Sequence, residues 1–170
     1  MTTFFDRIAN ALVWLVVLPA SACSTSRPPV VQDADAQIVT NRWLAAISKP
    51  YTPRYTDLTP EQINKAINAI PYRASDEWKP AVTDGDCEDY VIAKYHELSA
   101  QGVNGMKMRV VMLKKTGTAH AVLLARDGNG KWLVYDNRNP SGAPYALDHT
   151  RPDYQPVYDI DADTGAVTRL

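Results

Sequence analysis

The spacing of hydrophobic residues changes partway along this chain of 170 residues, and that change limits the folds open to it. Three segments of the first part have apolar side chains at helical spacing, namely 35–47, 60–70 and 83–101. Later segments are short aliphatic and aromatic runs typical of strands, namely 108–113, 119–125, 131–136 and a final pair within 158–169. Helices followed by strands predict one α+β domain with an antiparallel sheet, which we place at residues 35–170.

An apolar run near the N-terminus sets residues 1–22 apart from that domain. Residues 8–18 form a run of eleven residues that is followed by Pro19 and by small residues at 20–22. At ~1.5 Å per residue this run is too short for a bilayer core, which needs about 20 residues. A short apolar run before small residues is typical of a secretory signal peptide, and we expect residues 1–22 to be one.

The residue after this cleavage site is Cys23. Residues 18–24 read LPASACS and resemble a bacterial lipoprotein processing site, in which such a cysteine is lipidated and becomes the new N-terminus. Residues 23–34 are rich in proline and polar residues without periodicity, and we expect them to form a flexible tether. The sequence therefore predicts an exported protein held at a membrane by lipidated Cys23, with plain secretion and a buried N-terminal helix as the alternatives.

Charge and cysteine content narrow the class of protein further. The 18 Lys and Arg residues and 19 Asp and Glu residues leave a net charge of −1, which argues against a nucleic-acid partner. The chain has only two cysteines, Cys23 and Cys87, so cleavage or lipidation at Cys23 leaves Cys87 alone. A lone cysteine in an exported protein is either buried and inert or kept for its reactivity.

Cys87 lies at the start of the most clearly marked helix. Asp86 is suited to cap this helix, acidic residues fill its first turn, and Gln101 and Gly102 mark its end. A helix N-terminus favours a thiolate and presents backbone N–H groups to an oxyanion. The position of Cys87 is therefore suited to a nucleophile.

The hairpin between the second and third strands brings a histidine and a carboxylate together. If residues 128–130 form a three-residue loop, Asp127 pairs with Lys131, and His120 lies one diagonal step from Asp136 on the same face. Together with Cys87, these residues form a candidate catalytic triad in which His120 takes the thiol proton and Asp136 orients the imidazole. A shorter loop would place the two side chains on opposite faces.

The other two histidines fit a catalytic role less well. His96 is nine residues beyond Cys87, and ~100° per residue carries it to the opposite side of the helix, where we expect a solvated side chain. His149 lies in a loop without periodic support, and it is a weaker candidate than Asp136 for the third residue of the triad.

Four carboxylates surround the candidate nucleophile, namely Asp84, Asp86, Glu88 and Asp89. Negative charge raises the pKa of a thiol above its usual value of roughly 8.5, which opposes the activation that the helix provides. A calcium ion bound by these oxygens would compensate and would fix the helix start. The alternative is that the acids cap the helix and face water.

These residues resemble a known family. The motif GDCEDY at 85–90, the residues Ala93–Tyr95, the run HAVL at 120–123 and YDN at 135–137 resemble the bacterial transglutaminase-like cysteine proteinases of the LapG type. Upstream, the family's approach to the catalytic helix is matched by Ile63, Asn64, Ile67, Asn68, Tyr72, Asp76 and Trp78. The resemblance spans residues 60–138. It implies a papain-like or transglutaminase-like fold, a triad of Cys87, His120 and Asp136, and calcium bound by Asp86 and Glu88.

The resemblance also implies a biological setting. Characterised members are periplasmic, cut large surface adhesins and so disperse biofilm, and are sequestered by a membrane-bound cyclic-di-GMP receptor. We therefore expect a protein substrate, with an adhesin as the example, and a regulatory receptor in the membrane. This chain is shorter than the typical member, and the stretch 78–85 is contracted, which bears on the substrate and the receptor but not on the triad.

The sequence thus favours an exported, calcium-dependent cysteine endopeptidase acting through an acyl-enzyme. A cell-wall peptidase or a transamidase with the same chemistry is an alternative within enzymes. A calcium-binding lipoprotein without catalysis is the alternative outside them, and it predicts that loss of the Cys87 thiol has no functional effect.

Overall fold

The computed structural model describes residues 33–139, 141–149 and 151–170. The predicted signal peptide at 1–22, Cys23 and most of the predicted tether lie outside the described residues. In this described part, three helices precede six strands: α1 (Asp33–Ile47), α2 (Pro60–Asn68), α3 (Cys87–Ala100), β1 (Lys107–Leu113), β2 (Thr118–Arg126), β3 (Trp132–Tyr135), β4 (Tyr145–Ala146), β5 (Tyr154–Asp161) and β6 (Val167–Arg169). Within these described ranges, no helix has both the length and the hydropathy needed to cross a membrane.

The six strands form one antiparallel sheet in the order β4-β3-β2-β1-β5-β6. The predicted α+β class with an antiparallel sheet is therefore confirmed. The hairpin of β2 and β3 has the predicted register, because Leu123 pairs with Tyr135 and Asp127 N–H donates to the carbonyl of Lys131 at 2.8 Å. Gly130 closes this turn at φ 79°, a left-handed conformation that glycine adopts without a steric penalty. This short turn fixes the register of the hairpin and therefore the position of Asp136 relative to His120.

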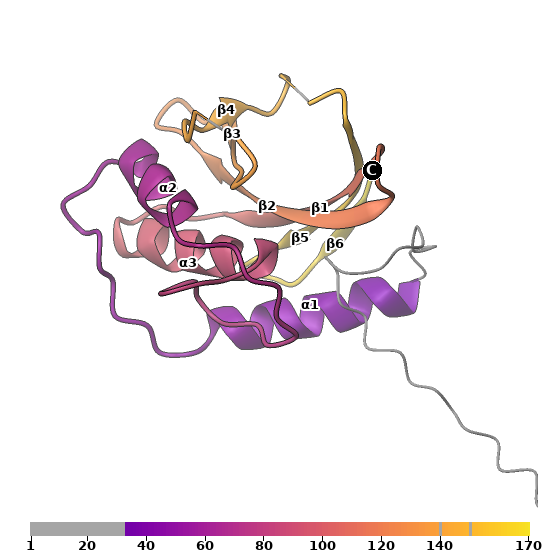
Figure 1. Ribbon diagram of the computed structural model, residues 1–170, viewed down its shortest axis with the longest axis horizontal. Coiled ribbons are helices and arrows are strands. Elements are labelled where there is room, and N and C mark those ends of the chain that lie inside the picture. The colour runs from indigo at the N-terminus through magenta and orange to yellow at the C-terminus, as the bar shows by residue number, and fades with distance from the viewer. Residues whose placement is uncertain (1–32, 140, 150) are drawn as a thin grey trace, which may run out of the picture.

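The helices cover one face of a curved sheet, so the domain has two layers (Figure 1). The alternation of β2 explains the layers, since Ala121 and Leu123 pack into the main core with the helices, while Val122 and Leu124 face a smaller cluster on the other side. That smaller cluster includes Tyr154 of β5. Alternate residues of a strand lie on the same face, so His120 shares with Val122 the face that carries Tyr154.

The helix α2 begins where the sequence predicts, whereas α1 begins at Asp33, two residues before the predicted helix and inside the predicted tether of residues 23–34. Thr59 and Gln62 form a reciprocal capping box at the start of α2, with Pro60 at its first position. The helix ends at Asn68, so the predicted extension to residue 70 is wrong by two residues. Ile63 and Ile67 are fully buried against the core and fix which face of α2 turns inward.

A buried carboxylate of α3 fastens the connector between α1 and α2. Glu97, only 1% exposed, accepts a hydrogen bond from the hydroxyl of Tyr51 at 2.6 Å. It also accepts from the backbone N–H of Arg54 at 2.9 Å and of Tyr55 at 3.0 Å. A buried carboxylate that satisfies several donors orders an otherwise irregular segment. This connector therefore holds α2 in place relative to the helix that carries Cys87.

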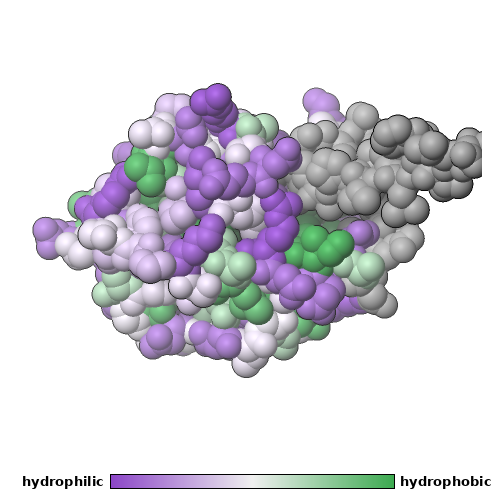
Figure 2. Space-filling model, turned by 90° about the horizontal axis from the view of Figure 1, so that it is seen from below, coloured by the Kyte–Doolittle hydropathy of each residue, from purple (hydrophilic) through white to green (hydrophobic). Residues whose placement is uncertain are grey.

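The surface seen from below is mostly hydrophilic, with hydrophobic residues in small separate patches (Figure 2). The large apolar side chains that are exposed come from several different elements: Ile38, Tyr72, Val82, Val167 and Leu170. Scattered apolar residues of this kind are ordinary on a protein surface. Tyr72 is one of the residues that line a pocket with His120.

Candidate active site

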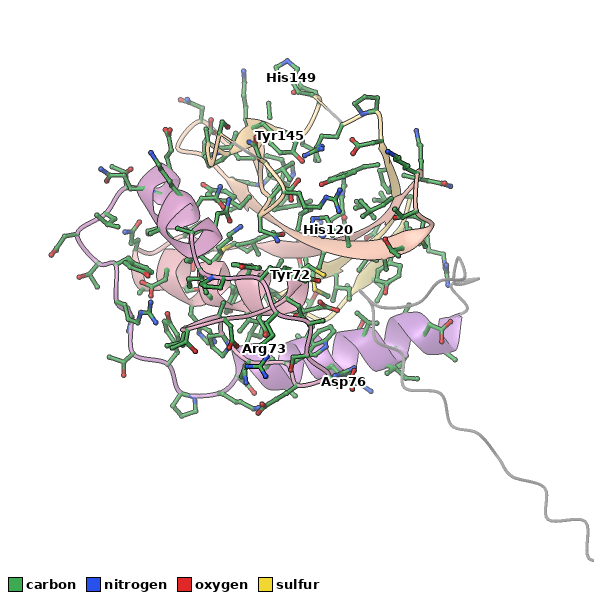
Figure 3. All side chains as sticks on the ribbon, in the orientation of Figure 1. Tyr72, Arg73, Asp76, His120, Tyr145 and His149 are labelled. Atoms are coloured by element: carbon green, nitrogen blue, oxygen red, sulfur yellow. The ribbon has the colours of Figure 1, made fainter. Side chains whose placement is uncertain are left out.

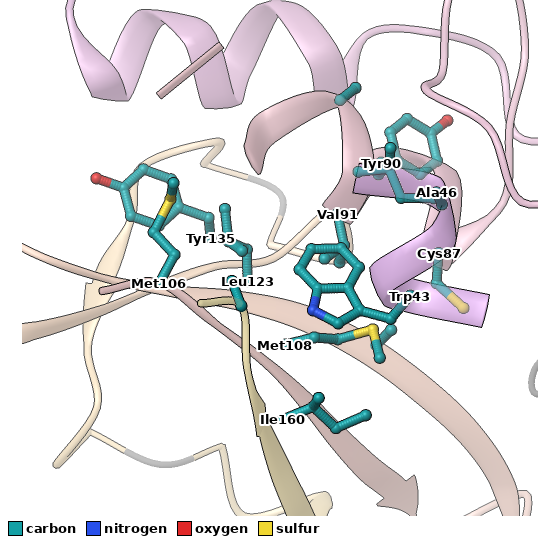
Figure 4. Packing of buried hydrophobic residues seen from close by; sticks show 14 of the residues in the cluster. Trp43, Ala46, Cys87, Tyr90, Val91, Met106, Met108, Leu123, Tyr135 and Ile160 are labelled. Carbon is teal, nitrogen blue, oxygen red and sulfur yellow. The ribbon is translucent and has the colours of Figure 1, made fainter. Parts of the chain in front are cut away.

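Cys87 is the first residue of α3 and so lies in the first turn, where the sequence predicts it. Asp86 caps the helix in a capping box with Asp89, whose backbone N–H donates to the Asp86 side chain at 3.4 Å. The side chain of Cys87 is 1% exposed and borders the core cluster that includes Trp43 and Val91 (Figure 4). The nucleophile considered below is the reduced thiol of Cys87.

His120 and Asp136 are in direct contact, as the hairpin register predicts. Nε2 of His120 lies 2.9 Å from Oδ1 of Asp136, and both side chains are buried, at 4% and 0% exposed. Neutral imidazole that gives its Nε2–H to a carboxylate keeps Nδ1 as an acceptor. The pair therefore leaves one ring nitrogen of His120 able to take a proton from another group.

Three further donors converge on Asp136. Its carboxylate accepts from the hydroxyl of Tyr154 at 2.8 Å, the hydroxyl of Tyr145 at 3.3 Å and the backbone N–H of Arg138 at 2.8 Å. Burial alone would raise the pKa of Asp136, but the hydrogen bond and charge of His120 and the other donors hold it well below its usual range. Asp136 is therefore ionised throughout the neutral range.

Burial has the opposite consequence for the imidazole. Desolvation lowers the pKa of His120 and outweighs the upward effect of the neighbouring Asp136 carboxylate. His120 is therefore uncharged at neutral pH until it accepts a proton. A neutral, buried imidazole oriented by a carboxylate is the form that a general base requires.

Two asparagines on one face of α2 hold the segment that carries Asp136. Asn68 Nδ2 donates to the backbone carbonyl of Asp136 at 3.0 Å, and Asn64 Nδ2 donates to the carbonyl of Gly142 at 2.7 Å. A Cβ at Gly142 would lie 3.3 Å from the side chain of Lys65, so the loop approaches the helix closely. The helix therefore clamps both ends of the loop 136–142.

A pocket of about 270 Å³ opens beside His120. Its lining residues are Tyr72, Leu113, Thr118, Ala119, His120, Asn137 and Arg138. Tyr72 also pairs through its backbone with Gly85, two residues before Cys87, and its ring stacks on that of Tyr90 of α3 at 6.5 Å. Tyr72 and His120 are neighbours in Figure 3 and both line the pocket, so the pocket adjoins the segment that pairs with Gly85.

The acidic residues at the start of α3 are buried rather than facing water. Asp86, Glu88 and Asp89 are 4%, 3% and 0% exposed, so the alternative of solvated first-turn acids is wrong for these three. Asp89 is used by the fold, since it completes the capping box and accepts the backbone N–H of Lys79 at 3.0 Å. Burial raises the pKa of Asp89 to about 6.

Asp86 and Glu88 are the two buried carboxyl groups beside Cys87 that could hold a metal ion. Burial, reinforced by the charge of Asp86, raises the pKa of Glu88 to about 8, and Glu88 Oε2 lies 2.9 Å from Sγ of Cys87. In the described part of the chain, no three side chains of the His, Cys, Asp or Glu type form a metal-binding group. Ionised carboxylates are nevertheless hard oxygen donors, so a bound cation would favour the charged form of both groups, and backbone carbonyls or waters would complete the coordination.

The remaining histidines lie away from the pair. His96 is half-buried, stacked on Tyr51 at 4.6 Å between ring centroids, and burial lowers its pKa. The expectation of a solvated His96 is therefore wrong, because the 51–55 connector covers that side of α3. His149 is exposed and lies far above His120 in Figure 3, next to Trp132 and Asp148 in another pocket.

Lys94 is a buried cation two helical turns after Cys87. It is 1% exposed, its Nζ lies 3.5 Å from the carbonyl of Tyr135, and burial lowers its pKa to about 7. An unfolded lysine holds its proton up to a pH near 10.4, so the unfolded state binds more protons between these values, and stability rises with pH there.

We expect Lys94→Met to abolish this pH dependence. Relative to the variant, the wild type should gain about 1 kcal/mol of unfolding free energy per pH unit between roughly pH 7.5 and 9. Urea unfolding at several pH values measures the slope, with Lys131→Met as a control at an exposed lysine. If the unfolding free energies of the wild type and Lys94→Met changed equally with pH, the pKa of Lys94 would not be lowered in the folded protein.

Sequence reasoning missed several residues that support the pair. Tyr145 and Tyr154 reach Asp136 from strands that follow it in the chain, and no local pattern marks them. Asn64 and Asn68 of α2 were matched to the family, but their contacts with the loop after Asp136 were not predicted. They had a usable signal, because they are one helical turn apart and adjoin the buried Ile63 and Ile67. Polar residues beside a buried stripe indicate a partner across the interface.

A cysteine at a helix N-terminus, packed on an antiparallel sheet that carries a buried histidine and carboxylate, defines the class of transglutaminase-like cysteine peptidases. The model of one family, the bacterial transglutaminase-like cysteine proteinases, matches residues 54–154. The chain belongs to this family and is a cysteine peptidase, which confirms the resemblance read from the sequence. No curated protein matches the chain.

Solved structures of LapG from Legionella pneumophila are similar to this chain. The calcium-bound form is 23% identical, with a TM-score of 0.54 over 79% of this chain and 80% of that one. The EGTA-treated form is 22% identical, with a TM-score of 0.54 over 82% of this chain and 79% of that one. This likeness confirms the transglutaminase-like fold.

Proposed function

We propose that the protein is an exported, calcium-dependent cysteine endopeptidase whose catalytic triad is Cys87, His120 and Asp136. The observation that carries this proposal is the buried contact between His120 Nε2 and Asp136 Oδ1 at 2.9 Å, beside a pocket lined by Tyr72, which pairs with Gly85 two residues before Cys87. A structural histidine does not need an oriented, neutral ring at the wall of an open pocket. A general base does.

The proposed reaction uses these residues in two stages. Nδ1 of His120 takes the proton of the Cys87 thiol, and the thiolate attacks the carbonyl carbon of the scissile peptide. The C–N bond then breaks, and the proton on His120 passes to the leaving amine. In the second stage His120 deprotonates a water molecule, which attacks the thioester, releases the carboxylic acid product and restores the thiol.

The fold supplies two further contributions to this reaction. The backbone N–H of Cys87, at the first position of α3, lies outside the helical hydrogen-bond ladder and is suited to stabilise the developing oxyanion. Asp136 remains ionised and favours the imidazolium that forms on His120. Both groups are fixed before substrate binds, so neither has to reorganise during the reaction.

Calcium in this proposal is held by the carboxylates of Asp86 and Glu88. When bound, the ion would supply positive charge beside the nucleophile and fix the start of α3. The Legionella pneumophila LapG solved in calcium-bound and EGTA-treated forms supports this assignment by its likeness in fold. The requirement arises here because Glu88 Oε2 lies 2.9 Å from Sγ, where an unbalanced carboxylate would oppose a thiolate.

We further propose that the substrate is a protein, with a large surface adhesin as the leading class, and that a membrane-bound receptor regulates the enzyme. The proposed setting is the periplasm, with lipidated Cys23 as the membrane anchor. These parts rest on the sequence motifs and on family membership. Mass analysis of the exported protein, which distinguishes a lipidated from a free N-terminal residue, tests the anchor.

The alkylation rate of Cys87 tests the proposal without a substrate. In reduced full-length protein carrying Cys23→Ser, iodoacetamide is expected to modify Cys87 rapidly at pH 7 with calcium. The rate should fall at least tenfold with chelator or in His120→Ala, because both changes remove support for the thiolate. His149→Ala is the matched control and should react as the parent does. Slow alkylation that is indifferent to calcium and to His120 would favour a calcium-binding protein without catalysis.

A further inference from the structure

The pocket beside His120 contains a positive charge that the proposed chemistry does not use. Arg138 lines its wall, two residues after Asp136 and facing the same space as His120 and Tyr72. A cation at the wall of a cleft is a recognition element for anionic ligands. The charge of Arg138 can attract a ligand only if no carboxylate of the protein already neutralises it.

The backbone of Arg138 is fixed while its side chain remains exposed. Its N–H donates to Asp136 Oδ1 at 2.8 Å, and its carbonyl accepts from Arg151 Nη1 at 3.1 Å. The position of Arg138 relative to the catalytic carboxylate is therefore set from both sides. A side chain mounted on such a fixed backbone presents its charge at a defined place in the pocket.

The nearby carboxylates are engaged elsewhere. Oδ1 of Asp136 lies 2.9 Å from the His120 ring, and Asp153 pairs with Arg151 at 3.2 Å. Throughout the described ranges, the guanidinium of Arg138 has no carboxylate within ion-pair distance and makes no hydrogen bond. The charge of Arg138 is therefore available to a ligand.

The other walls suit a short polar group. Tyr72, 57% exposed, is one of the lining residues and carries a phenol, while Thr118 and Ala119 are small residues that line the pocket with His120. A phenol and a guanidinium both donate hydrogen bonds, and a carboxylate accepts from both. The pocket therefore combines space, donors and positive charge at the side of the proposed base.

We propose that Arg138, with Tyr72, makes this pocket select peptides that carry a carboxylate next to the scissile bond. The inference rests on the proposed peptidase function, because it assigns the substrate class of the same site. The carboxylate comes either from an Asp or Glu side chain or from the C-terminus of a short peptide. Arg138 is a specificity-determining residue in this assignment and takes no part in bond breaking.

Cleavage of matched peptides by the full-length protein, reduced and with calcium, tests the assignment. A random-sequence library is first digested to locate cleavage, and the best sequence is then remade with Glu, Gln or Lys at each neighbouring position. Each version is made as the C-terminal acid and as the amide. We expect about tenfold higher kcat/KM for a carboxylate at one position, in the side-chain or the C-terminal series.

Variants of Arg138 must move this preference in a defined way. Arg138→Gln should remove it, Arg138→Lys should keep part of it, and Arg138→Glu should favour the Lys peptides. Lys131→Glu makes the same charge change at the far turn of the β2–β3 hairpin and should leave the preference unchanged.

The outcomes separate this inference from the function on which it rests. Equal cleavage of the Glu, Gln and Lys peptides by the wild type overturns the inference and leaves the peptidase proposal intact. A preference that survives in Arg138→Gln overturns it as well. No cleavage of any library peptide by folded protein with calcium overturns both proposals.

Discussion

Cys87→Ala is expected to abolish peptide hydrolysis while the fold persists. The proposed reaction passes through a thioester on Sγ of Cys87, and none of the described residues that line the pocket beside His120 carries a thiol. Loss of a catalytic nucleophile in related chemistry costs about 10⁶-fold in kcat. Hydrolysis of the best library peptide measures this loss, and circular dichroism with thermal unfolding checks the fold.

A matched variant separates chemistry from packing in this test. Val91 is 1% exposed and lies in the same core cluster one turn further along α3, so Val91→Ala creates a cavity without removing the thiol. It should lower stability by about 1–3 kcal/mol and keep most of the activity. Cys87→Ala that retains activity within tenfold of the wild type would contradict the nucleophilic role and favour calcium binding as the function.

The hairpin shows why part of the candidate site could be predicted from sequence. A turn signal of the type DGNG fixes loop length, loop length fixes register, and register fixes which side chains share a face. The observed pairing of Leu123 with Tyr135 and the contact of His120 with Asp136 both follow from this chain of local rules. The start of α3 was predictable for the same reason, since Asp86 and Asp89 lie within one turn.

Contacts between distant segments could not be read in this way. Tyr154 follows Asp136 by 18 positions and reaches it only because β5 pairs with β1 on the side of the sheet away from β3. The half-burial of His96 depends on the connector at 51–55, which has no regular structure of its own. Burial of the acids at 86–89 depends on the loop at 75–81 that folds over them, as the bonds from Ser75 and Lys79 show.

Asp136→Ala is expected to lower kcat/KM by about 10⁴-fold with Cys87 still present. Loss of the orienting carboxylate of a triad costs about this much in related enzymes. The effect has two parts here, because the alanine removes the partner of His120 and also leaves the donors of Tyr154, Tyr145 and Arg138 unpaired. We expect a loss of about 3 kcal/mol in unfolding free energy from those buried donors.

Three further variants separate the catalytic effect of Asp136→Ala from its effect on stability. Asp136→Asn keeps an oxygen that accepts the Nε2–H of His120, but its NH2 group cannot accept from the tyrosine hydroxyls. We therefore expect its kcat/KM to lie between those of Asp136→Ala and the wild type. Tyr154→Phe removes one support at 2.8 Å and should cost only a few-fold, since Tyr145 and the Arg138 N–H remain. Asp153→Ala removes an equal charge from an exposed acid next to the site and should change activity less than twofold. Asp136→Ala that loses stability but keeps kcat/KM within tenfold would assign Asp136 to the fold alone, because an unoriented imidazole would then suffice for the proton transfer.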